Sequence, residues 1–206
     1  KLNYIKVFDL SSKSVGERAL KNKCLSYLSQ IGEYDLAYAQ YNSADCMTDQ
    51  FSAFQCLLDS SNPYRDEVIS RFYKQHKSDV QVMDKWFSAQ CASSIISIAD
   101  IRKLMKHELF SMTNPNRVRS VIGSFSRNSI QFHCKDGYQL LTEIIIKLDG
   151  MNPQIAARFV SIFNHWRRFT NKYSALQKNE LNSIISQKKL SDDVYEIVHT
   201  SLKEGN

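Results

Sequence analysis

Apolar residues recur at intervals of three and four along almost the whole chain, the spacing that places side chains on one face of an α-helix. The stripe nearest the N-terminus consists of Leu20, Cys24, Tyr27, Leu28 and Ile31. The most apolar stripe consists of Leu140, Leu141, Ile144, Ile145 and Leu148. The stripes predict about ten short helices, each with one apolar face that must pack against a neighbour. The segment from Leu2 to Leu10 fits either a strand or a loop.

Several of these helices have a recognisable start. All three prolines follow an asparagine, in Asn62-Pro63, Asn114-Pro115 and Asn152-Pro153. An asparagine side chain can accept hydrogen bonds from the free N–H groups of a first helical turn, and proline loses no hydrogen bond at the first helical position. Ser191, followed by two acidic residues, predicts a further start.

Two of the starts share a longer pattern. The segments NPNRVRSVIGSF, from Asn114, and NPQIAARFVSIF, from Asn152, lie 38 residues apart. Aligned on Asn-Pro, they have matching apolar positions: Val121 with Phe159, Ile122 with Val160, and Phe125 with Phe163. The offset is near that of HEAT and armadillo repeats, although the preceding one, from Asn62, is 52. We therefore expect an all-α fold: an irregular curved stack, or superhelix, of antiparallel helix pairs with one concave side.

Composition agrees with helices joined by short loops. The 206 residues include only three Pro and six Gly, too few for a sandwich or barrel of this size. No stretch rich in Gly, Pro or Ser interrupts the chain, so we expect one helical domain over residues 1–206. No apolar run reaches the length of a membrane span. The first residue is Lys1 rather than Met, which is what a piece of a longer protein would show.

Charge and cysteine usage narrow the function classes. The formal charge is +6, but the densest cationic clusters are pairs, Arg167-Arg168 and Lys188-Lys189, with no basic run interleaved with aromatic residues. We therefore expect no nucleic-acid partner. The five cysteines are widely spaced and odd in number, which favours reduced, buried thiols and a cytoplasmic protein.

No catalytic or metal site is expected within the chain. His107-Glu108 begins like a zinc-peptidase motif, but the fourth residue after His107 is Ser111 rather than a second histidine. We expect His107 to lie on the surface near a helix end. His133 and Cys134 are adjacent, so their side chains should point apart, and a partly buried thiol is the simpler interpretation.

Arginine is the residue type with the most chemical interest. Arg117 lies in the first turn of one capped helix, with Arg119 beside it, and Arg158 lies about one turn deeper in the similar helix. Helix starts present N–H groups, and guanidinium groups there suit a carboxylate or carbonyl oxygen. The alternative is that these arginines hold neighbouring loops.

Several segments resemble the C-terminal helical domain of the bacterial aminopeptidase N family. The segments are VMDKWF at Val82–Phe87, FSMTNPNRVRSVIGSF at Phe110–Phe125, and NPQIAAR at Asn152–Arg158. Supporting segments are RALKNKCLSYL at Arg18–Leu28, the triplet Met47-Thr48-Asp49 before a helix, and LSDDVYE at Leu190–Glu196. The resemblance extends from about Arg18 to Leu202, in family order.

The resemblance implies a parent enzyme larger than this chain. Members of the family are zinc metallopeptidases that remove single N-terminal residues from peptides, with zinc on an H-E-x-x-H helix and a G-x-M-E-N loop gripping the substrate amine. Neither motif occurs here, so the catalytic zinc domain is expected upstream, and the first helices of the stack with it. In relatives the arginines matching Arg117 and Arg158 face a substrate cavity.

Two functions remain in competition. The first is a C-terminal fragment of a zinc aminopeptidase that closes over its upstream catalytic domain and lines the peptide cavity through Arg117 and Arg158. This fragment would be inactive and zinc-free alone. The alternative is a free-standing helical-repeat scaffold that binds a protein partner on its concave face.

Overall fold

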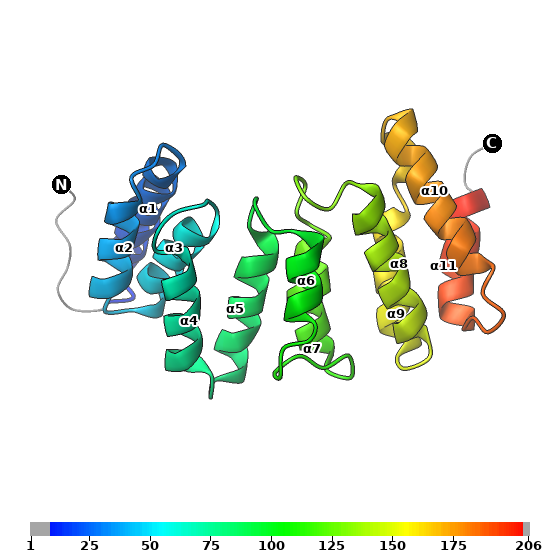
Figure 1. The fold of residues 1–206 in the computed structure, drawn as a ribbon, viewed down its shortest axis with the longest axis horizontal. Coiled ribbons are helices and arrows are strands. Elements are labelled where there is room, and N and C mark those ends of the chain that lie inside the picture. Colours follow the sequence, from blue (N-terminus) through cyan, green and yellow to red (C-terminus); the bar gives the residue numbers. More distant parts are fainter. Residues whose placement is uncertain (1–8, 204–206) are drawn as a thin grey trace. The chain divides into compact units, whose positions relative to one another are not determined.

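The computed structural model describes residues 9–203, and every regular element within them is a helix (Figure 1). The described residues form eleven α-helices, one π-helical turn and two 3₁₀ turns. The prediction of an all-α fold with about ten short helices is therefore confirmed. The segment from Leu2 to Leu10 lies outside the described residues, apart from Asp9 and Leu10.

The chain divides into two compact units, Lys1–Ile95 and Ile96–Asn206. The first unit contains α1 (Ser12–Gln30), α2 (Tyr34–Ser43), α3 (Met47–Leu58), α4 (Arg65–His76) and α5 (Val80–Ala92). The second contains α6 (Ile98–Leu104), α7 (Pro115–Val118), the π-helical turn η1 (Arg119–Gly123), α8 (Lys135–Asp149), α9 (Pro153–Val160), η2 (Ser161–Phe163), η3 (Trp166–Arg168), α10 (Asn171–Ile185) and α11 (Asp192–Lys203). Each unit has its own apolar core, and the expectation of a single domain stays a prediction.

Helix α3 lies at the centre of the first unit, where it contacts α1, α2, α4 and α5. Its Phe54 stacks on Phe72 of α4, with ring centroids 4.5 Å apart and both rings fully buried. A three-residue turn joins α4 to α5, which lie side by side (Figure 1). Trp86 of α5 donates its indole N–H to the carbonyl of Ile69 on α4, at 3.1 Å. These contacts satisfy the indole while burying its ring.

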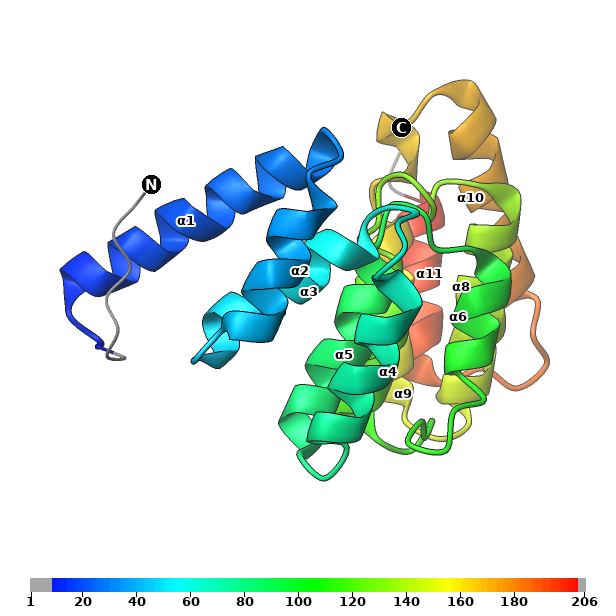
Figure 2. The same ribbon diagram turned by 60° about the vertical axis from the view of Figure 1, so that its left-hand side comes forward.

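The apolar stripe predicted for α1 does not face the core. Leu20, Tyr27 and Ile31 are 55%, 59% and 76% exposed. Helix α1, which Figure 2 shows along its length, instead turns a largely polar side inward, and its buried residues are Ser14, Leu25 and Ser29. The inward side is set by a carboxylate: Asp49 of α3, fully buried, accepts hydrogen bonds from Lys21 and Asn22. Because a buried charge must be paired, this contact determines which side of α1 packs.

Helix α8 is the centre of the second unit, in contact with α6, α9 and α10, and α11 packs on α9 and α10. All five apolar residues predicted as its stripe are at most 1% exposed. Tyr138, at the start of the same helix, is also fully buried. Its hydroxyl accepts a hydrogen bond from Gln177 of α10 at 3.0 Å and lies 2.9 Å from His133 Nδ1. Polar as well as apolar contacts therefore join α8 to α10.

Two of the three predicted Asn-Pro starts are correct. The Asn114 side chain accepts hydrogen bonds from the N–H groups of Asn116 and Arg117, and Asn152 accepts one from Ile155. The prediction for Asn62 is wrong, because α4 begins at Arg65 with Tyr64 as its N-cap. The Asn62 side chain instead accepts from the Tyr64 N–H and donates to the carbonyl of Leu57, so it shapes the preceding turn.

Two further helix starts were assigned from sequence. Ser191 caps α11 by accepting the N–H of Val194 at 3.3 Å, as predicted. The triplet Met47-Thr48-Asp49, placed before a helix by sequence, forms the first turn of α3 instead. Asp49 therefore lies inside α3, where it is fully buried.

The two similar helices bury their matched apolar positions, as predicted, but have different backbones. All six matched apolar residues are at most 6% exposed. After Arg117 and Val118 the first helix widens into the π-helical turn η1, whereas the second tightens into the 3₁₀ turn η2. A π turn is uncommon and tends to occur at functional positions.

Gly137 is required by a close approach of two backbone segments. A Cβ atom at this position would lie 2.2 Å from the carbonyl oxygen of Phe132. Gly137→Ala should therefore lower the free energy of unfolding by about 3 kcal/mol, since neither backbone can move aside. Gly150→Ala is the matched control, because the nearest atom there is 3.9 Å away. Urea denaturation of both variants measures the difference, and equal midpoints would contradict the close approach.

Candidate functional site

The candidate site is built on the start of the helix formed by α7 and η1. Pro115 occupies the first helical position, so Arg117 falls in the first turn, directly beneath the Asn114 cap. The Ser120 hydroxyl donates to the carbonyl of Arg117 at 2.9 Å. The side chain of Arg117 is not on the surface, since only 4% of the residue is exposed. The helix start thus carries a buried positive charge.

Arg158 has a different environment. It lies in the last turn of α9, after the Asn152 cap and Pro153. Its neighbours Ala157 and Phe159 are buried, whereas Arg158 itself is exposed. Position 123 of η1 lies against Phe159, since a Cβ built there would be 3.9 Å from its ring. The two similar helices therefore meet, with one arginine buried and the other exposed.

His107 lies in the loop before α7, close enough to Arg117 for their charges to interact. Burial lowers the pKa of His107, Glu108 opposes this shift, and Arg117 adds to it. His107 Nδ1 accepts the N–H of Leu109 at 3.2 Å, so the neutral ring carries its proton on Nε2. Half-buried, His107 is not the surface residue that the sequence suggested.

Positive charge is unevenly shared between the two units. Residues 96–206 contain sixteen Lys and Arg against ten Asp and Glu, whereas residues 1–95 contain eleven of each. The whole formal charge of +6 therefore falls in the unit that contains Arg117 and Arg158. Such a unit attracts anionic groups by a field that reaches about 10 Å at 0.1 M salt.

The histidine–cysteine pair considered from sequence does not form. His133 bonds to the hydroxyl of Tyr138, whereas Cys134 caps α8 by accepting the N–H of Gly137 at 3.3 Å. Cys134 is exposed, so the expectation of a partly buried thiol is wrong. All five cysteines, which lie within residues 9–203, are free thiols, but Cys24 and Cys134 are exposed and only Cys91 is fully buried.

Asp45, Cys46 and Asp49 bring three potential metal ligands within 4.8 Å of one another. The two oxygens of Asp49 are already engaged, one by the ammonium of Lys21 and the other by the Asn22 amide. Gln40 adds a hydrogen bond to the carbonyl of Asp49 at 3.0 Å. Because the ammonium already stands where a cation would bind, these residues fit a structural role rather than a zinc site.

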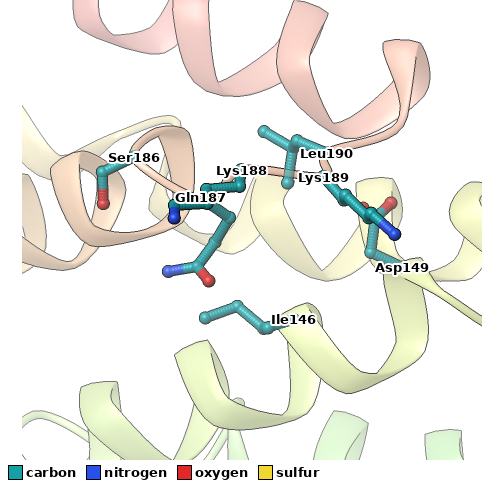
Figure 3. Close-up of a pocket in the computed structure, with 7 residues that line it drawn as sticks. All are labelled: Ile146, Asp149, Ser186, Gln187, Lys188, Lys189 and Leu190. Atoms are coloured by element: carbon teal, nitrogen blue, oxygen red, sulfur yellow. The ribbon is translucent and has the colours of Figure 1, made fainter.

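A pocket of about 460 Å³ lies between the end of α8 and the loop from α10 to α11 (Figure 3). The residues lining it are Ile146, Asp149, Ser186, Gln187, Lys188, Lys189 and Leu190. Asp149 is engaged with the next helix start, where its carboxylate accepts the N–H and hydroxyl of Ser191. Neither arginine of the candidate site lines this pocket.

No helix among the described residues is both long and apolar enough to cross a membrane.

Comparison with known proteins gives a consistent result. The family model of ARM repeats named DUF3458_C, a domain of unknown function, matches residues 2–203. Aminopeptidase N of Haemophilus influenzae is 32% identical over 202 residues, or 95% of this chain and 23% of the relative. Aminopeptidase N of Escherichia coli is 32% identical over 208 residues, or 97% of this chain and 24% of the relative.

A solved structure is similar over the same length. Aminopeptidase A of Legionella pneumophila, crystallised with aspartic acid, matches with a TM-score of 0.88 and 29% identity. The match covers 98% of this chain and 25% of that protein. The chain therefore spans about a quarter of the length of the relatives it resembles.

The structural interpretation of Asp49 is testable. Asp49→Ala leaves Lys21 and Asn22 without their buried partner, so the free energy of unfolding should fall by about 3–5 kcal/mol. Asp66→Ala is the control, since the Asp66 side chain is 98% exposed and its removal should have little effect. We expect the chelator EDTA to leave the urea midpoint of the unaltered chain unchanged. A midpoint lowered by EDTA and restored by zinc would show that the three ligands bind metal.

Proposed function

This chain belongs to the DUF3458_C family of ARM repeats and corresponds to the C-terminal domain of aminopeptidase N, and on that premise we propose that it is the non-catalytic helical part of a zinc-dependent aminopeptidase. In the whole enzyme, which removes N-terminal residues from peptides, this part closes over the upstream catalytic domain and lines the substrate cavity. The main support for this proposal is that nearly the whole chain matches about a quarter of each aminopeptidase N.

Two features support a non-catalytic role for the chain. No H-E-x-x-H or G-x-M-E-N motif occurs in its 206 residues. Among residues 9–203, the one cluster of potential ligands is Asp45, Cys46 and Asp49, and the Asp49 carboxylate is engaged by Lys21 and Asn22. The chemistry of peptide hydrolysis, and the zinc that it uses, therefore belong to the part of the enzyme outside this chain. A free-standing scaffold has no comparable support, because the relatives are longer aminopeptidases.

We assign the contact with peptide to Arg158 and Arg117. Arg158 is exposed on α9, so its guanidinium is available to a backbone carbonyl or a C-terminal carboxylate. Arg117 is buried at the neighbouring helix start, where its charge adds to the field of that helix end. The net charge of the second unit favours the same anionic end of a peptide. A cytoplasmic location, expected from the cysteines, stays a prediction.

The isolated chain should have no aminopeptidase activity on an alanyl amide and no stoichiometric zinc after purification. The reason is that the ligands and the general base would lie elsewhere in the enzyme. Activity assays with metal analysis by mass spectrometry measure both, with the full-length enzyme as the positive control. Chelator-sensitive activity in the isolated chain would contradict the proposal.

In the full-length enzyme, Arg158→Ala should raise KM for a tripeptide about tenfold, the loss expected for one hydrogen bond to a charged group. A small alanyl amide, which does not extend beyond the cleaved bond, should be unaffected. Arg117→Ala should act in the same direction, with a lower thermal midpoint because Arg117 is buried.

Two controls separate binding from folding. Arg127 is exposed in the same unit, and Arg127→Ala should leave both substrates unchanged. Arg158→Lys, which keeps the charge, should recover part of the lost affinity. Equal effects of Arg158→Ala on tripeptide and amide would mean that the side chain holds a loop rather than substrate.

A further inference from the structure

His133, which the proposed function does not use, lies where three segments of the second unit meet. Its ring contacts Tyr138 at the start of α8, Phe169 after η3 and Tyr173 of α10, with ring centroids 5.9, 4.9 and 6.5 Å away. The side chain is half-buried among these rings. A group whose charge changes near neutral pH therefore lies within the contact between α8 and α10.

Hydrogen bonds fix the protonation state of His133 in this arrangement. The Gln177 amide donates to the Tyr138 hydroxyl oxygen at 3.0 Å, and the same oxygen lies 2.9 Å from His133 Nδ1. Because the oxygen already accepts from Gln177, its own hydrogen is donated to Nδ1. Nδ1 is then an acceptor, and the proton of the neutral ring lies on Nε2. The chain of hydrogen bonds from α10 to His133 therefore requires a neutral imidazole.

Protonation of His133 would break this chain of hydrogen bonds. Both ring nitrogens of an imidazolium are donors, so Nδ1 would present a hydrogen to an oxygen that already accepts one. The hydroxyl hydrogen of Tyr138 would lose its acceptor, although Tyr138 is fully buried and Gln177 is only 2% exposed. An unsatisfied buried donor is costly, and the imidazolium would also lack hydration. The charged ring is therefore favoured where α10 has moved away and water reaches it.

No carboxylate among the described residues offsets this cost, because the pKa of His133 is lowered by burial alone. The titratable groups around the contact are Tyr173 of α10 and the Cys134 thiol, both of which act on the hydroxyl bonded to Nδ1. Phe169 brings no charge. Lys172 of α10 has its ammonium 5.7 Å from the centroid of the Tyr173 ring. A cation nearby disfavours the imidazolium, as burial does.

We propose that His133 is a pH-sensitive contact between α8 and α10: the neutral ring holds α10 against α8, and protonation of the ring favours detachment of α10. Because the pKa of His133 is lowered in the folded chain, the stability that it contributes is complete above the ordinary histidine pKa of 6.5 and is lost as the pH falls below it. The proposal needs neither zinc nor peptide, so it can fail separately from the proposed function.

Hydrogen exchange followed by mass spectrometry tests the proposal in the full-length protein, with α10 observed through its own peptides. After correction for the intrinsic pH dependence of exchange, the protection of α10 should fall at least about threefold from pH 7.5 to pH 5.5, because opening of α10 returns His133 to water. Helix α9, which packs on α8 and contains no histidine, is the internal reference and should change little.

Three variants separate His133 from other groups that titrate in this range. His133→Asn keeps an acceptor oxygen near the place of Nδ1 but takes up no proton, so the fall in α10 protection should disappear. His165→Asn is the matched control, because His165 is exposed in the same unit and the fall should remain. Tyr138→Phe removes the hydroxyl that links His133 to Gln177, so α10 should be less protected already at pH 7.5 and the remaining fall should be smaller.

Three outcomes would overturn the proposal. Equal protection of α10 at both pH values would show that protonation of His133 does not act on this helix. A fall that persists unchanged in His133→Asn would assign the pH dependence to another group. An equal fall in α9 would mean general unfolding in acid rather than detachment of one helix.

Discussion

Burial of apolar side chains between neighbouring helices is the interaction on which the rest of this structure depends. The helices range from four to nineteen residues, and helices of this length are marginal in water without packing. Each unit therefore has a helix that contacts most of the others, α3 in the first and α8 in the second. The apolar side of α8 is buried almost completely, which orders α9 and α10 around it. This packing also fixes the position of the candidate site, because α7, η1 and α9 bury the side chains next to Arg117 and Arg158.

Polar contacts fix the details that apolar burial leaves open. Asp49 selects the side of α1 that faces α3, and Asp149 holds the start of α11 through Ser191. Arg167 donates to the carbonyls of Ser201 and Leu202 at 2.8 and 2.9 Å, so it satisfies the end of the same helix. Buried polar groups without partners are costly, so each of these contacts favours one arrangement of neighbouring helices over others of similar apolar burial. Much of the charge within the helix stack is structural, which leaves Arg158 as the clearest candidate for contact with substrate.

The candidate site was partly accessible from sequence. The Asn-Pro starts at Asn114 and Asn152 and the three matched apolar pairs follow from local rules of capping and periodicity, and the structure agrees with all of them. The same rules gave Arg117 and Arg158 equivalent roles, but one is buried and the other exposed. Their difference arises from tertiary packing, which buries Arg117 and leaves Arg158 exposed, and helical periodicity carries no signal for it. The π turn after Arg117 could not be predicted either, because helical periodicity does not separate π from α turns over five residues.

By itself, the sequence determined the fold class, the number of helices to within about one, and the family, because helical periodicity, caps and motifs are properties of residues close together in the chain. It also placed the stripe on α1 correctly as a helix face. Only the tertiary structure decided that this face is exposed. The buried side of α1 is selected by its contact with Asp49, which lies in the first turn of α3. The same holds for Gly137, where the backbone of Phe132 leaves no room for a side chain. It also holds for Asn62, whose side-chain amide donates a hydrogen bond to the carbonyl of Leu57. Local rules specify what each segment can form, and contacts between segments decide which of its sides is used.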